Sequence, residues 1–81
     1  MTETTEVTFD QELDCQGMLC PLPILKTKKV MDTMNAGEVL KMLSTDAGSV
    51  NDINAWTRQT GNDLVFATAN EGLYTYFLRK S

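Results

Sequence analysis

The sequence contains no histidine and only two cysteines among its 81 residues. A cysteine hydrolase needs a neighbouring base such as histidine to activate its thiol, so the absence of histidine argues against that chemistry. The two cysteines, Cys15 and Cys20, are too far apart to form the C-x-x-C pair of redox proteins. A closed zinc site within one chain would need two carboxylates besides both thiols, so we expect no metal.

Long apolar runs and an excess of positive charge are also missing. No run approaches the roughly 20 residues that a membrane-spanning helix needs, and residues 1–6 lack the basic and apolar character of a signal peptide. We therefore expect a cytoplasmic protein with no membrane association. The formal net charge of −4 at pH 7 argues against direct binding of nucleic acid, which needs clustered lysine and arginine.

The length of the chain suits one domain with a single small core. We expect a flexible acidic tail over residues 1–8 and one domain over residues 9–81. Hydrophobic patterns and turn signals predict the elements in the order strand, helix, strand, helix, strand, strand. Their expected ranges are 9–14, 21–35, 38–44, 49–60, 64–69 and 73–79. This order indicates an α/β two-layer sandwich, a four-stranded mixed sheet with both helices packed on one face.

Local signals set the expected details of these elements. Phe9 and Leu13 should lie on the same side of the first strand, because side chains alternate along a strand. Ser49 is a favourable N-cap for the second helix, and Gly61 is a favourable stop for it.

The helix predicted for residues 21–35 has two different faces. At about 100° per residue, six side chains fall within one arc of roughly 120°, the width of a core-facing stripe. These six are Pro23, Ile24, Thr27, Val30, Met31 and Met34. Leu22 and Leu25 fall outside this arc, on the same side as Lys26 and Lys29.

Cys20 stands where this helix is expected to begin. Proline is favoured at the first helical position, so Pro21 indicates that Cys20 is the N-cap. The positive end of the helix dipole stabilises an anion there and lowers the pKa of a thiol, which makes Cys20 a candidate reactive sulfur. Because Pro23 has no N–H, Leu22 and Ile24 are left as backbone donors near the sulfur.

Residues 13–29, L-D-C-Q-G-M-L-C-P-L-P-I-L-K-T-K-K, resemble the signature of the TusA family of sulfur carrier proteins, also called SirA-like. The resemblance extends over nearly the whole chain from Phe9 onward. It implies the sheet and helices described above, and it implies that Cys20 is the sulfur-carrying cysteine. Many members of the family have arginine where this sequence has Gln16, so one positive charge near the thiol is absent here.

The resemblance also implies a route for the sulfur. Cys20 would accept sulfane sulfur from a cysteine desulfurase or a rhodanese-like donor protein and relay it as a persulfide to an acceptor protein. The covalent persulfide sulfur is then the cargo, and no other cofactor is expected. Members of the family serve tRNA 2-thiolation, molybdenum cofactor metabolism and sulfur oxidation. Whether such a protein is a sulfurtransferase or a carrier without turnover of its own stays open.

Other residues near Cys20 have more than one interpretation. Gly17, Pro21, Leu22 and Pro23 are expected to position the thiol. Cys15 could approach Cys20, resolve a persulfide into a disulfide, or fill space in the core, and filling space is the favoured interpretation.

The surface of the first helix supports a second class of function. Leu22, Leu25, Lys26 and Lys29 form an apolar and basic patch that should dock donor and acceptor proteins. The alternative function is therefore a noncatalytic adaptor or regulatory module that binds proteins through this helix. We expect the protein to be a monomer.

Overall fold

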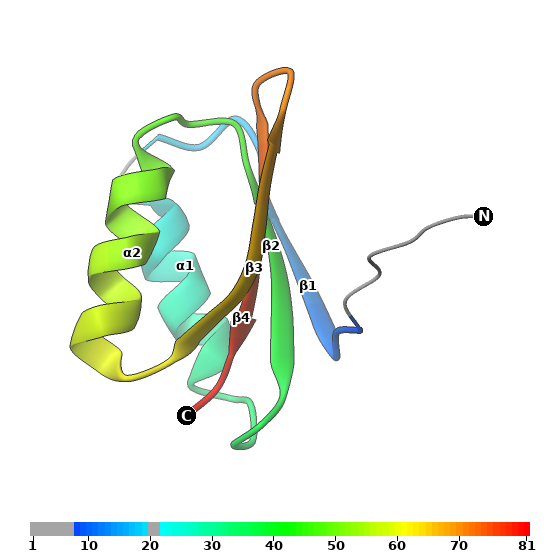
Figure 1. The fold of residues 1–81 in the computed structure, drawn as a ribbon, viewed down its shortest axis with the longest axis vertical. Helices are drawn as coiled ribbons and strands as arrows, with labels where there is room; N and C mark the ends of the chain where they lie inside the picture. Colours follow the sequence, from blue (N-terminus) through cyan, green and yellow to red (C-terminus); the bar gives the residue numbers. More distant parts are fainter. Residues whose placement is uncertain (1–7, 20–21) are drawn as a thin grey trace.

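A computed structural model describes residues 8–19 and 22–81 of the chain. The elements in these residues are β1 (Gln11–Cys15), α1 (Leu22–Met31), β2 (Val39–Ser44), α2 (Ser49–Thr60), β3 (Asp63–Asn70) and β4 (Leu73–Arg79) (Figure 1). Most of the acidic tail predicted for residues 1–8 lies outside the described residues.

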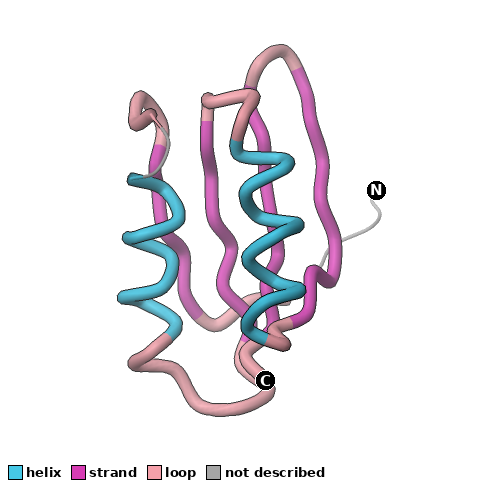
Figure 2. Tube along the Cα trace, turned by 90° about the vertical axis from the view of Figure 1, so that its left-hand side faces the viewer, coloured by secondary structure: helices cyan, strands magenta, loops and turns pink. Residues whose placement is uncertain are grey.

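The four strands form one mixed sheet in the order β1-β2-β4-β3. β1 and β2 are parallel, whereas β4 is antiparallel to both of its neighbours, β2 and β3. Parallel neighbours need a crossover connection, and α1 supplies it between β1 and β2. Both helices lie side by side on one face of the sheet (Figures 1 and 2). The predicted two-layer α/β sandwich is therefore confirmed.

The core lies between the two helices and the sheet face that they cover. Alternation along β2 buries Leu40 and Met42, and the residues paired with them, Leu78 and Tyr76 of β4, are buried on the same face. The buried apolar cluster consists of Cys15, Met31, Met34, Leu40, Met42, Ile53, Trp56, Tyr76 and Leu78. No helix among the described residues is long and apolar enough to cross a membrane.

The two faces predicted for the first helix are observed. Pro23, Thr27, Met31 and Met34 are buried, and Ile24 and Val30 pack partly buried against the core. In contrast, the side chains of Leu22 and Leu25 are 49% and 53% exposed. Helical spacing alone therefore separated the buried side of α1 from its exposed side.

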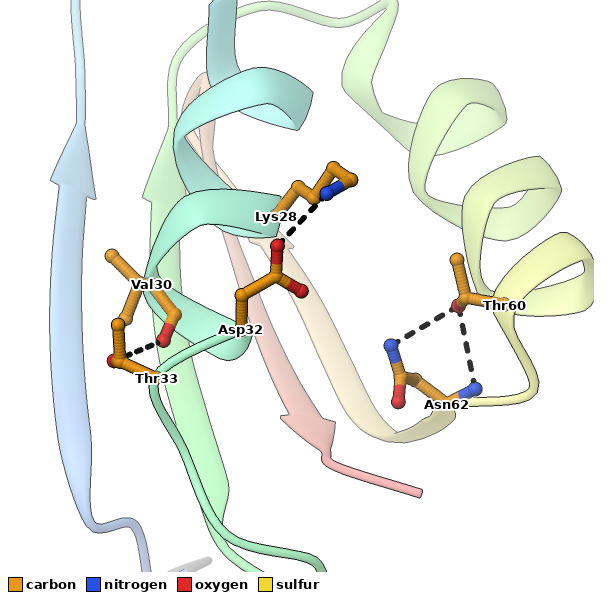
Figure 3. A network of polar contacts seen from close by, with 6 residues as sticks. All are labelled: Lys28, Val30, Asp32, Thr33, Thr60 and Asn62. Atoms are coloured by element: carbon orange, nitrogen blue, oxygen red, sulfur yellow. Dashed lines mark hydrogen bonds and ion pairs between the residues drawn. The ribbon is translucent and has the colours of Figure 1, made fainter.

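The predicted end of this helix at residue 35 is wrong, because α1 ends at Met31. Beyond that point the N–H groups of Thr33 and Met34 donate to the carbonyls of Val30 and Met31, three residues back, at 3.0 Å each. The hydroxyl of Thr33 also donates to the Val30 carbonyl at 2.6 Å (Figure 3). These tighter bonds use up the last carbonyls of the helix and turn the chain toward β2.

The N-cap predicted for the second helix is also wrong. Ser49 lies inside α2, where its buried Oγ is 2.7 Å from the hydroxyl of Tyr76. The chain enters the helix through Asp46, whose carboxylate accepts the N–H of Gly48 at 3.0 Å and whose carbonyl accepts that of Ser49 at 3.0 Å. At the other end Gly61, with φ of 80°, closes the helix as predicted.

Phe9 does not share a side with Leu13, contrary to the prediction. β1 begins only at Gln11, because the chain bends at Asp10. The N–H of Asp10 donates to the Val39 carbonyl, and the Asp10 carboxylate accepts the N–H of Val39, at 2.8 Å each. The Phe9 ring instead lies 6.2 Å from that of Phe77, whose side chain points away from the helices, whereas Leu13 packs against the core.

Candidate functional site

The loops that carry the candidate residues meet at one end of the molecule. The ends of the parallel strands β1 and β2, the starts of both helices and the β3–β4 turn all lie at this end (top of Figure 1). Cys20 and Pro21, predicted as the reactive sulfur and the first helical residue, lie outside the described residues. The site is therefore built from the segments that flank them, residues 14–19 before and α1 after.

A tight turn directs the chain from β1 toward Cys20. The N–H of Met18 donates to the carbonyl of Cys15 at 3.1 Å, and the N–H of Gln16 donates to the carboxylate of Asp14 at 2.9 Å. Gly17 has a φ of 81°, as the third residue of a type II turn requires, and glycine adopts that angle without strain. Gly17, which the sequence analysis expects to help position the thiol, thus lies in the turn that follows β1.

The start of α1 differs in one respect from the prediction. The N–H of Leu22 donates to the carbonyl of Leu19 at 2.9 Å, so it is committed to the backbone instead of being a donor for the sulfur of Cys20. Pro23 is buried in the first turn of the helix, where its missing N–H breaks no helical bond. No acidic residue occupies this first turn, so no carboxylate of α1 opposes the positive end of the dipole.

The predicted docking residues lie together on the exposed side of α1. Leu22 is three positions from Leu25 and four from Lys26, and Leu25 is four from Lys29, the spacings at which helix side chains are neighbours. All four are exposed. We call these four residues, Leu22, Leu25, Lys26 and Lys29, the α1 patch.

Two further residues near the α1 patch in the sequence were given no part in the site by the sequence analysis. Leu19 is 71% exposed and precedes Cys20, but an isolated leucine in a loop has no periodicity from which its exposure could be inferred. Lys28, which the sequence places among the basic residues of this helix, is paired with Asp32 at 2.8 Å (Figure 3). That hydrogen bond lowers the pKa of the Asp32 carboxyl.

Cys15 ends β1 and is fully buried in the apolar core. Burial raises the pKa of its thiol, the Lys26 ammonium opposes this shift, and the Asp14 carboxylate adds to it. A buried thiol with a raised pKa is mostly protonated near neutral pH and is a poor nucleophile. These properties are those of a residue that fills space. In the part of the chain that the structure describes, no group of three metal-ligating side chains could hold a metal ion.

Comparison with known proteins assigns most of the chain to one protein family. A family model described as sulfurtransferase TusA matches residues 11–80. The chain is 47% identical over 73 residues to the sulfur carrier protein TusA of Allochromatium vinosum, covering 90% of this chain and 96% of that protein. It is 46% identical over 68 residues to the putative sulfur carrier protein YrkF of Bacillus subtilis, covering 84% of this chain but only 37% of that longer protein.

A solved structure supports the fold independently of close sequence similarity. The SirA-like protein of Desulfitobacterium hafniense superposes with a TM-score of 0.75 at 20% identity, over 86% of this chain and 96% of that one. At this identity the likeness supports the arrangement of strands and helices and not the chemistry.

Proposed function

The chain belongs to the TusA family of sulfur carrier proteins, and from this premise we propose that it carries sulfur as a persulfide on Cys20. The observation that supports Cys20 most strongly is the burial of the other thiol. Cys15 is enclosed in the core and its pKa is raised, so it is poorly suited to attack a sulfur held by another protein. With two cysteines in the sequence, Cys20 is the remaining candidate.

The proposed transfer consists of two thiol–persulfide exchanges. The Cys20 thiolate attacks the terminal sulfur of a persulfide on a donor protein, the donor's S–S bond breaks, and the donor cysteine leaves as a thiolate. An acceptor thiolate then attacks the sulfur carried on Cys20 and releases Cys20 as a thiolate. Neither exchange has a net oxidation or reduction, so no external oxidant, reductant or metal is needed. Each rate depends on how much of the attacking thiol is ionised.

The surroundings of the motif favour ionisation of a thiol at the start of α1. The first turn of α1 contains no acidic residue, and the N-terminal end of a helix stabilises an anion. Lys26 is close enough to the β1–α1 end of the molecule to act on the Cys15 thiol. Because a partly ionised thiol needs no separate base to attack sulfur, this environment fits a chain without histidine.

We propose that donor and acceptor are proteins that dock on the α1 patch. Exposed leucines beside exposed lysines suit a partner surface with an apolar centre and acidic groups at its rim. The chain itself has a net charge of −4, so a basic patch on it also orients an approaching acidic partner.

Mass spectrometry after incubation with a persulfidated donor protein tests the proposal. The wild-type protein should gain one sulfur on the peptide that contains Cys20. Cys20→Ser should abolish the gain, whereas Cys15→Ser, the matched control, should retain it. An equal loss in both variants would indicate a dithiol mechanism instead.

The adaptor function makes a different prediction for the same proteins. If the protein acts only by binding, the wild type gains no sulfur although it binds its partner, and Cys20→Ala changes nothing. For a carrier, Cys20→Ala keeps partner binding through the α1 patch but ends sulfur transfer. Measuring binding and transfer on the same samples separates the two functions.

A further inference from the structure

One hydrogen bond joins the turn that leads toward Cys20 to a different loop. The N–H of Gly17 donates to the Oγ1 of Thr45 at 2.8 Å, across 28 residues of sequence. Other hydrogen bonds in this turn are local, since Gln16 donates to Asp14 and Met18 donates to Cys15. The bond to Thr45 therefore ties the turn to the loop that follows β2, whereas the local bonds tie it only to the end of β1.

The sheet places Thr45 beside this turn. β1 and β2 are parallel, and Cys15 at the end of β1 pairs with Ser44 at the end of β2. Thr45 follows Ser44 directly, as the turn follows Cys15, so the two loops leave the sheet edge next to each other.

The backbone around Thr45 is itself held in place. Ser44 is fully buried and its Oγ accepts the N–H of Asp46 at 3.1 Å. Asp46 in turn accepts the N–H groups of Gly48 and Ser49 at the entry to α2. Thr45 thus lies between two residues with fixed positions, and its hydroxyl is presented to Gly17 by a stiff segment.

We propose that Thr45 is a positioning residue for sulfur transfer, because its hydroxyl anchors the turn that delivers Cys20. This inference rests on the proposed function of Cys20. Without the anchor, the turn keeps its local bonds but is no longer tied to β2 and α2. Residues 16–19, which lead to Cys20, are then held less firmly relative to β2 and α2, and productive encounters with a docked partner become rarer.

Thr45→Val tests this proposal, because it removes the acceptor and preserves the shape of the side chain. The loss of one hydrogen bond should slow transfer from a persulfidated donor protein by about twofold to tenfold. It should also move the pH midpoint for alkylation of Cys20, followed on the Cys20 peptide by mass spectrometry. Thr45→Ser, which restores the hydroxyl, should recover both properties.

Thr33→Val is the matched control. The Thr33 hydroxyl also bonds to the backbone, but it donates to the nearby Val30 carbonyl at 2.6 Å, and Thr33 lies beyond the opposite end of α1. This variant should leave both the transfer rate and the alkylation midpoint unchanged. The proposal is overturned if Thr45→Val behaves like the wild type in both measurements, or if Thr33→Val alters them equally. A wild-type protein that gains no sulfur would instead refute the function of Cys20, and the alkylation midpoints would still test Thr45.

Discussion

The two helices pack on the same sheet face but present different surfaces to the outside. Both have a buried side, to which α1 contributes Met31 and α2 contributes Ile53 and Trp56. Outside, α2 is mainly polar, with exposed Asn51, Asn54, Arg58 and Gln59 and one apolar exception, Val50. The outer side of α1 instead carries the leucines and lysines of the α1 patch. Core packing explains the inner sides of both helices, whereas the leucines of the α1 patch keep about half of their surface in solvent.

The largest expected effects are on the free energy of unfolding, and they test whether the buried sides of α1 and α2 stabilise the fold equally. Met31→Ala and Ile53→Ala remove side chains that are 1% and 0% exposed, so each should lower the free energy of unfolding by about 2–5 kcal/mol. Leu25→Ala, at an exposed position, should change it by about 0.5 kcal/mol or less. Chemical denaturation measures all three. If Leu25→Ala were as costly as Met31→Ala, the α1 patch would belong to the core.

Tyr76→Phe is expected to have the next largest effect, because it removes the anchor of α2 to the sheet. The Ser49 hydroxyl would stay buried without its partner at 2.7 Å, which costs about 1–3 kcal/mol. In the double variant Ser49→Ala/Tyr76→Phe neither group is left unpaired, so its loss should be smaller than that of Tyr76→Phe. A double variant with the larger loss would show that the pair contributes more than hydrogen-bond satisfaction.

The same tyrosine makes stability depend on alkaline pH. Burial raises the pKa of Tyr76 in the folded state above its value in the unfolded chain, and the hydrogen bond to Ser49 partly opposes that shift. The resulting stabilisation is fully present below the unfolded pKa of about 10 and is lost as the pH rises through the folded pKa. Between pH 8 and 11 the free energy of unfolding, measured by chemical denaturation, should therefore decrease more steeply for the wild type than for Tyr76→Phe.

Charge reversal compares the outer sides of the helices directly. Lys26→Glu and Lys29→Glu together should slow transfer from an acidic donor protein by about tenfold at low salt, the lower end of the range for electrostatic steering. The difference should shrink as salt screens the charges. Arg58→Glu on α2, at an exposed position, changes the net charge as much as Lys26→Glu or Lys29→Glu alone and is the matched control for each of these single variants. An equal effect from Arg58→Glu would mean that total charge, and not the α1 patch, sets the rate.

The order of residues along the chain predicted those features of the fold that depend on sequence neighbours, and it failed for features set by distant residues. The buried side of α1 followed from the 3.6-residue period, since Thr27 and Met31 face the core wherever the helix packs. Phe9 was misplaced because the bend before β1 is held by Val39, 29 positions away in the sequence. Ser49 was assigned as a cap for the same reason, since its partner Tyr76 is 27 positions away.

In the candidate site, too, sequence neighbours indicated some features, whereas others depend on residues far apart in the sequence. The helix-start motif and the family resemblance point to Cys20 as the candidate sulfur carrier, and periodicity points to the exposed residues of the α1 patch. The anchor at Thr45 depends on the register of β1 against β2, so no local pattern indicated it. The exposure of Leu19 depends on the path of its loop and was equally inaccessible.

The smallest expected effects on the free energy of unfolding come from glycine substitutions in the segments that precede the two helices. Gly17, before α1, has a φ of 81°, and a Cβ added there would meet nothing within 4 Å. Gly17→Ala should therefore lower the free energy of unfolding by about 1 kcal/mol through backbone strain alone. Gly48, before α2, has φ of −66° and ψ of −16°, and a Cβ there would contact Asp46 at an ordinary 3.5 Å.

Gly48→Ala should thus raise the free energy of unfolding, by about 0.4–1 kcal/mol, because alanine restricts the unfolded chain at no cost to the folded one. Gly17→Asn should recover part of the loss caused by Gly17→Ala, since asparagine tolerates positive φ better. Denaturation midpoints of the three variants measure these differences. Opposite signs at the two glycines would show that only the entry to α1 imposes a conformation reserved for glycine. A neutral Gly17→Ala would mean that the turn before Cys20 can relax to negative φ, and the anchor at Thr45 would then have no fixed turn to hold.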